Sequence, residues 1–88
     1  MVSILVALDS TVVAILLNVF LSKLLGKFAN DEEIKPPNGA AALSLKSQFM
    51  HMMVHHDQVL FMSSFIVGLV VFLATILSQL LRPLSRLM

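Results

Sequence analysis

The feature that most constrains this chain is a long stretch without charge, because residues 58–81 contain no Asp, Glu, Lys or Arg. A helix that crosses a bilayer needs about 20 consecutive, mostly apolar residues. Residues 59–81 are apolar on nearly every side of a helix, whereas a surface helix of a soluble protein is apolar on one side. We therefore predict a transmembrane helix over 59–81 that ends at Arg82-Pro83, followed by a basic C-terminal tail over 82–88.

The composition of the whole chain agrees with a membrane protein. Hydrophobic residues make up 58% of the sequence and charged residues 12%, whereas ordinary soluble domains are about 25% charged. A soluble core built from 88 residues would also be marginal in stability. The chain has no cysteine, which excludes disulfides and thiolate metal ligands. Its net charge of +1 gives no reason to expect a nucleic-acid partner.

A second apolar segment, which we predict to form the first transmembrane helix, occupies residues 1–28, and its single acid, Asp9, allows two interpretations. If residues 2–22 cross the membrane, Asp9 lies within hydrocarbon at a cost of about 2.5–3.5 kcal/mol unless it meets a partner. If the span starts near Asp9, the carboxylate forms a polar edge and complements the positive end of the helix dipole. We favour the second interpretation because it needs no buried charge. The segment lacks the basic start of a signal peptide, so we expect it to be retained.

Residues 29–39 are the stretch most typical of a loop. They combine an acidic run at 30–33 with the sequence Pro36-Pro37-Asn38-Gly39, a strong turn signal. Proline lacks an amide donor and restricts the residue before it, so the first helix must end before this point. We expect the loop to lie in water. Beyond it, residues 40–81 contain no proline and could form one helix about 60 Å long.

Residues 40–58 are polar on one side and apolar on the other when they are placed on a helix. The polar residues follow three- and four-residue steps, and Leu45, Phe49 and Met53 lie across from them. We predict an amphipathic helical shoulder outside the bilayer, which either continues straight into the second span or bends at Gln58. The predicted fold is an all-α membrane protein, a two-helix transmembrane hairpin with a long second helix and both termini on one side.

Both predicted spans carry a stripe of small residues at three- and four-residue steps, the pattern that lets helices pack closely in lipid. The two stripes either pack against each other or face another protein. A Met- and Phe-rich shoulder suits a protein partner, because thioethers adapt to irregular surfaces. The candidate packing residues are Ser10, Ala14, Asn18 and Ser22 in the first span, Phe49 and Met53 in the shoulder, and Ser64, Gly68 and Thr75 in the second span.

Three histidines precede the second span and raise the question of a metal site or a proton relay. His51 and His55 are four residues apart, so that one metal ion could reach both, but the sequence offers no clear third and fourth ligand. Histidine titrates near neutral pH, so Asp9, His51, His55 and His56 are candidate interfacial or proton-handling residues. We favour hydrogen bonding at the interface and expect no bound metal.

The sequence contains no nucleophile with a base, no phosphate-binding loop and no paired acids. We therefore expect neither an enzyme, nor a cofactor, nor a small-molecule substrate. The most economical hypothesis is a structural accessory subunit of a large membrane complex, whose partners are other membrane subunits and the lipid bilayer. Two alternatives stay open: a small proton- or ion-conducting oligomer lined by Asp9, Asn18, Ser22 and the histidines, and a substoichiometric regulator of a transporter or pump.

In size and layout the chain resembles the supernumerary two-helix subunits of mitochondrial energy-converting complexes, above all those that extend ATP synthase in algae and protists. The features that carry the resemblance are the short hairpin, the acidic Pro-Pro loop at 30–39, the long second helix and the missing presequence. The resemblance implies a location in the mitochondrial inner membrane and a role in stabilising an ATP synthase or respiratory complex or its dimers. It implies no site residues.

Overall fold

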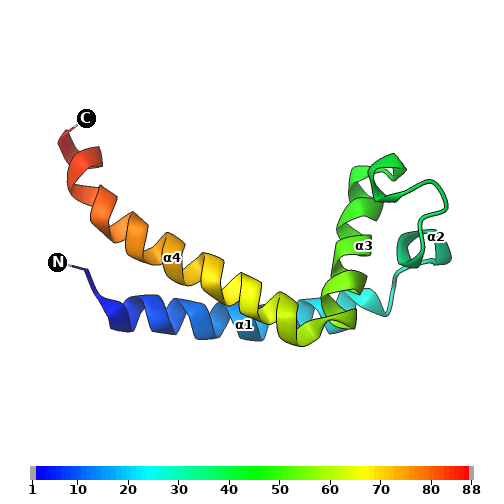
Figure 1. Cartoon of the computed structure of the whole chain (residues 1–88), viewed down its shortest axis with the longest axis horizontal. Coiled ribbons are helices and arrows are strands. Elements are labelled where there is room, and N and C mark those ends of the chain that lie inside the picture. The colour runs from blue at the N-terminus through cyan, green and yellow to red at the C-terminus, as the bar shows by residue number, and fades with distance from the viewer. Residues whose placement is uncertain (1, 88) are drawn as a thin grey trace.

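The computed structural model describes residues 2–87, and the side chains up to Arg82. Within this part of the chain all regular secondary structure is helical (Figure 1). The elements are α1 (Ile4–Gly26), α2 (Asp31–Ile34), the 3-10 turn η1 (Ala40–Ala42), α3 (Leu45–Gln58) and α4 (Leu60–Leu87).

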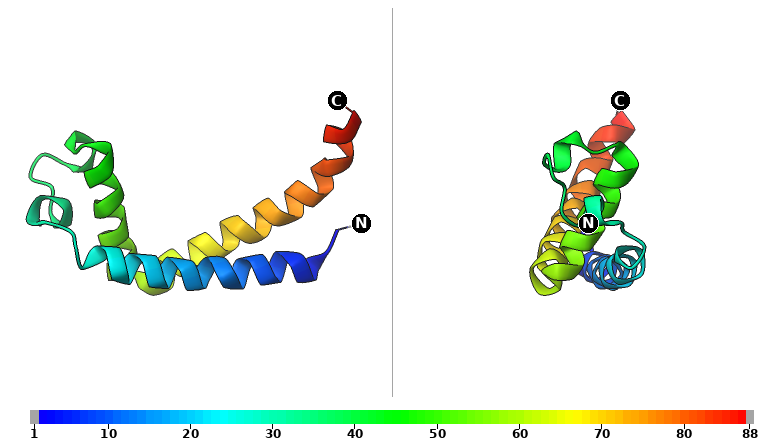
Figure 2. Two further views of the ribbon diagram at one scale, coloured as in Figure 1. Left: turned by 180° about the vertical axis from the view of Figure 1, so that it is seen from behind. Right: turned by 90° about the vertical axis from the view of Figure 1, so that its right-hand side faces the viewer.

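The molecule has two parts, which we call the arm and the head. The arm consists of α1 and α4, which pack along each other in opposite directions, with the start of α1 and the end of α4 at the same end of the molecule (Figures 1 and 2). The head is residues 30–58, in which α2 packs on α3 and α3 rises steeply from the C-terminal part of α1. Ile4–Gly26 and Leu60–Arg82 are each 23 residues long and apolar enough to cross a membrane.

Helix α1 begins at Ile4, because the Ser3 hydroxyl caps it by accepting a 3.2 Å hydrogen bond from the Val6 amide. Asp9 therefore lies in the second turn. The stabilising effect of the helix dipole on an acid falls off within the first turn, so the expectation that the Asp9 carboxylate complements the helix dipole is wrong. The apolar residues before Asp9 are helical like those after it.

Of the two alternatives for the end of the shoulder, a straight continuation or a bend, the structure shows the bend: the helix is interrupted at Val59, whose φ of −120° and ψ of 52° are not helical. The Ser63 hydroxyl donates a 2.9 Å hydrogen bond to the carbonyl of His56, which the break deprives of its usual helical partner. At this point α4 turns away from α3 (Figure 1). The chain thus bends one residue after Gln58, and the long continuous second helix is not formed.

The far end of α4 also differs from the expectation, because the helix continues through Pro83 to Leu87. Proline removes one amide donor from the helical ladder, but its fixed φ is compatible with a helix. Residues 82–87 of the expected basic tail are therefore helical, and residue 88 lies outside the described residues.

The predicted loop over 29–39 contains the one-turn helix α2. A capping box starts it: the Asn30 side chain accepts from the Glu33 amide, and the Glu33 side chain accepts from the Asn30 amide. Three acids in this first turn also suit the positive end of the helix dipole. The two prolines then end the helix, and Gly39, at a φ of 88°, takes a conformation that other residues rarely adopt.

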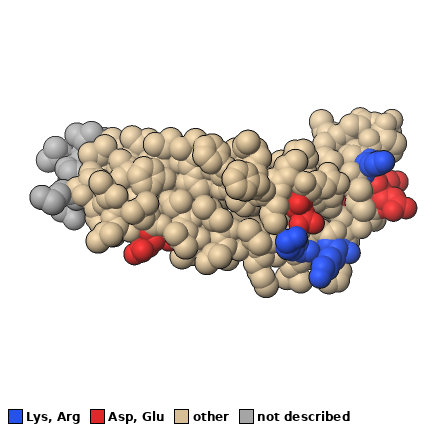
Figure 3. All heavy atoms as spheres, turned by 60° about the horizontal axis from the view of Figure 1, so that its bottom comes forward, with Lys and Arg blue, Asp and Glu red and all other residues tan. Residues whose placement is uncertain are grey.

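The distribution of side chains is the reverse of that in a soluble protein. Among the described residues the buried apolar side chains are Ala7 and Val54, whereas Asn18, Ser22, Glu33 and Ser63 are buried and polar. The large apolar side chains of the arm are mostly exposed. In Figure 3 charged groups gather at the head end, and the acid on the arm is Asp9, because α1 and α4 contain no other Asp or Glu.

Candidate functional site

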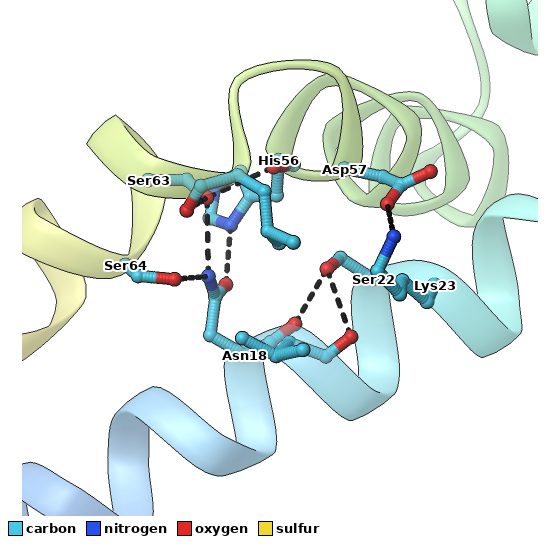
Figure 4. A network of polar contacts seen from close by, with 9 residues as sticks. Asn18, Ser22, Lys23, His56, Asp57, Ser63 and Ser64 are labelled. Carbon is cyan, nitrogen blue, oxygen red and sulfur yellow. Dashed lines mark hydrogen bonds and ion pairs between the residues drawn. The ribbon is translucent and has the colours of Figure 1, made fainter.

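The most connected polar cluster lies where α1, α3 and α4 meet (Figure 4). The buried Asn18 amide donates to the hydroxyls of Ser63 at 3.1 Å and Ser64 at 3.2 Å, while its oxygen is 2.8 Å from Nδ1 of His56. An amide oxygen can only accept, so the His56 tautomer in this arrangement carries its proton on Nδ1. We call Asn18, His56, Ser63 and Ser64 the junction cluster.

The junction cluster closes on itself. His56 donates to Asn18, Asn18 donates to Ser63, and the Ser63 hydroxyl donates back to the His56 carbonyl. No buried side-chain nitrogen or oxygen among the described residues lacks a hydrogen-bond partner. Polar groups that satisfy one another in this way can be buried without the usual cost of desolvation. The cluster therefore holds three helices together and also supports the bend at Val59.

Two further contacts surround the junction cluster on its α1 side (Figure 4). The fully buried Ser22 hydroxyl donates to the Asn18 carbonyl at 2.5 Å within its own helix. Lys23 and Asp57 form a 3.3 Å ion pair between α1 and α3, with 57% and 37% of their side chains exposed. An ion pair this exposed contributes little stability. Its main effect is on the orientation of α3 relative to α1.

Along the arm, small residues bring the two helices into close contact. A Cβ atom added to Gly68 would lie 2.9 Å from Cδ1 of Ile15 and 3.3 Å from Cγ2 of Thr11, so any larger residue here would force these side chains to shift. Near the other end, the Gln79 side chain accepts from the Ser3 amide at 2.7 Å and donates to the Ser3 carbonyl at 3.1 Å. The arm is thus joined by polar contacts at both ends and by close packing between them.

Glu33 is the centre of a second cluster, in the head. It is buried, and its side chain accepts from the Asn30 amide at 2.9 Å and from the Ser47 hydroxyl at 2.8 Å. These hydrogen bonds, the first more than the second, and then the charge of Lys46 hold the pKa of Glu33 below its usual value of 4.5 against the opposing effect of burial. The His51 ring donates from Nδ1 to the Glu33 carbonyl at 2.6 Å. These contacts dock α2 on α3.

The three histidines lie in different surroundings and do not contact a common site. His51 contacts α2, His56 contacts α1, and His55 is exposed. Within the described residues no group of three or more His, Cys, Asp or Glu side chains is placed to hold a metal ion. The helical spacing of His51 and His55 therefore does not translate into a shared site.

The candidate packing residues divide into inner and outer sets. Asn18, Ser22, Ser64 and Gly68 lie at contacts within the chain, whereas Thr75 donates to the Val71 carbonyl of its own helix and lines a hollow of about 330 Å³ beside Gln79. Ser10 and Ala14 instead line a hollow with Asp9 away from α4. Phe49 is 52% exposed, and Met53 is half-buried.

Sequence reasoning missed Glu33, Gln79 and the ion pair of Lys23 with Asp57. The capping box of α2 had a recognisable signal, an Asn followed three residues later by a Glu. The contact between Ser3 and Gln79 had none, because these residues are 76 positions apart and the periodicity of each helix says nothing about their pairing.

Comparisons of the chain with protein-family models, with curated proteins and with solved structures found no match.

Proposed function

We propose that this chain is a non-catalytic accessory subunit of a large membrane complex, which it stabilises by helix packing. The observation that supports this most is the exposure of its apolar surface: Leu5, Phe20 and Phe61 of the arm are 74%, 61% and 88% exposed. Surface of this kind needs lipid or protein around it. The inward-facing polar groups already satisfy one another, so they bind the helices of this chain and leave the outer faces for partners.

The head supports a protein partner in addition to lipid. Leu45, Phe49 and Met52 are 83%, 52% and 45% exposed on α3, a helix that the break at Val59 turns away from the arm. Helices that lie on lipid headgroups usually carry many basic residues, whereas Lys46 is the single lysine of α3 and no arginine is present. We propose that this apolar surface of α3 docks on a neighbouring subunit outside the bilayer.

We further propose that the complex is a mitochondrial ATP synthase or respiratory complex in the inner membrane. The layout of two spans joined by an acidic, Pro-Pro-containing segment supports this location. The ion-conducting alternative needs its polar residues on one shared surface. Asn18, Ser22 and His56 instead hydrogen-bond within the junction, and Asp9 lies elsewhere on α1.

Co-migration on a native gel of gently solubilised membranes tests the proposal. We expect the chain to run with a complex many times its own mass of 9.7 kDa at a fixed stoichiometry. The variants F49D and M52D place a charge in the exposed apolar surface of α3 and should release the chain from the complex. Met53 is less suitable for this test, because it is half-buried and its replacement would also disturb packing inside the chain.

H55D is the matched control, because it adds the same charge to an exposed position of α3 that is already polar and does not belong to the apolar surface residues. It should leave co-migration unchanged. A chain that runs alone, or a ratio to the complex that varies with growth conditions, would contradict a constitutive subunit. A variable ratio would favour the regulator.

A further inference from the structure

The packing of the arm determines how deep Asp9 lies if both helices cross a membrane. Ser3 pairs with Gln79, and Asn18 pairs with Ser64. In antiparallel helices each step forward along one is matched by a step backward along the other. Asp9 is six residues after Ser3, and Leu73 is six residues before Gln79, so the first pair places Asp9 level with Leu73. The second pair gives the same level, because Asp9 is nine residues before Asn18 and Leu73 is nine residues after Ser64.

Leu73 lies well inside the apolar part of α4. At 1.5 Å per residue it is about 13 Å from Arg82 and about 20 Å from Leu60 along the helix axis. The long side chains of Lys and Arg can reach an interface from such depth, but Asp9 has one methylene group and cannot. If both helices cross a membrane, this level puts the Asp9 carboxylate within the hydrocarbon, which favours the first of the two interpretations of residues 1–28.

Asp9 also faces away from its own chain. It is exposed, and it follows the fully buried Ala7 by two residues, which is about 200° around the helix. No hydrogen bond or ion pair reaches it from any described residue. Acids in transmembrane helices usually face other helices and pair there, so this carboxylate lacks the partner that its position requires.

The surface beside Asp9 has the shape that a partner helix needs. A shallow hollow of about 380 Å³ is lined by Asp9, by the small residues Ser10 and Ala14, and by Val13 and Leu17. Small residues four positions apart let another helix backbone approach closely. An approach along this hollow would bring the side chains of the arriving helix next to the carboxylate.

We propose that this face of α1 binds a transmembrane helix of a neighbouring subunit, and that this helix carries a lysine or arginine that pairs with Asp9. The negative charge of Asp9 decides which kind of partner can occupy this face of α1. A second copy of this chain in the same orientation has no cation at this level, because residues 4–22 and 60–81 contain no Lys or Arg. Lipid tails offer no countercharge. The proposal rests on the proposed function and adds the chemistry of the contact to it.

Charge-altering variants in native membranes test the pairing. D9N and D9L leave the cation of the partner unpaired, so the fraction that co-migrates with the complex should fall at least about tenfold, and D9E should retain it. D9L removes a charge from an apolar span and should still insert normally. Loss of co-migration by D9L therefore reports a lost contact and not a failure to insert.

Cross-linking identifies the partner, because the chain has no cysteine and single cysteines can be introduced. V13C lies beside Asp9, and L69C, which the same pairing places level with Val13, lies on α4. V13C should cross-link to one subunit whose membrane span contains Lys or Arg, and L69C should not. Replacing that cation by Asp should restore co-migration to D9K.

The two proposals fail in different ways. If the wild-type chain runs alone on the native gel, the accessory-subunit proposal is wrong, and the proposed pairing of Asp9 is wrong as well. If the wild type co-migrates but D9L does so equally, the pairing is wrong and the accessory role survives. Cross-linking of V13C to a second copy, or to a span without Lys or Arg, also overturns the pairing.

Discussion

The arm and the head bury polar groups by different rules. In the arm, the buried Asn18 and Ser22 are uncharged, and the single carboxylate, Asp9, is exposed and has no partner among the described residues. In the head, the carboxylate of Glu33 is buried and accepts two hydrogen bonds, while Asp31 and Glu32 are exposed. In the placement of its carboxylates the head thus follows the pattern of a protein surrounded by water, whereas the polar groups of the arm are arranged as in a protein surrounded by apolar material.

The largest effect is expected from overfilling the close contact of the arm. G68L places a bulky side chain against Ile15 and Thr11 and should destabilise the pair of helices by about 2–3 kcal/mol. Unfolding by SDS in mixed micelles measures this. A74L, at an exposed position of α4, is the control. Equal stability of the two variants would show that α1 and α4 do not approach closely at Gly68.

A smaller effect is expected when the junction cluster loses its centre. N18L keeps the branching of the side chain at Cγ but removes three side-chain hydrogen bonds and should cost about 1–2 kcal/mol, the upper range for hydrogen bonds between membrane helices. A double-mutant cycle of N18L with H56F should give a coupling of about 1 kcal/mol. Additive losses would mean that these residues do not act on each other.

The smallest and most local effect is expected in the head, from the titration of Glu33. Its pKa is lowered in the folded chain, so its contribution is complete above the usual value of 4.5 and is lost as the pH falls through the lower, folded pKa. The protection of the amides of residues 31–35 from exchange, measured relative to the unfolded chain at the same pH, should therefore fall in acid. E33Q should remove this pH dependence. An unchanged dependence in E33Q would place its origin in another acid.

Local properties of the chain were predictable because they depend on nearby residues. The apolar stretches predicted both long helices, and the acidic run with its two prolines marked the segment between them. The stripes of small residues in the two spans predicted the contacts between α1 and α4 only in part. Ser10 was among the candidate packing residues, but it is its neighbour Thr11 that lies against Gly68, which the periodicity of the sequence does not reveal.

The sequence by itself determined the two long apolar helical segments, because helix formation and hydropathy follow from residues a few positions apart. The tertiary structure alone decided the bend at Val59, the separation of the three histidines and the level of Asp9. Each depends on contacts between residues far apart in the chain, such as Ser3 with Gln79 and Asn18 with Ser63. The physical reason is that a helix alone does not determine which of its sides, or which residues along its axis, will contact another element. Only the packing of a neighbouring helix decides both.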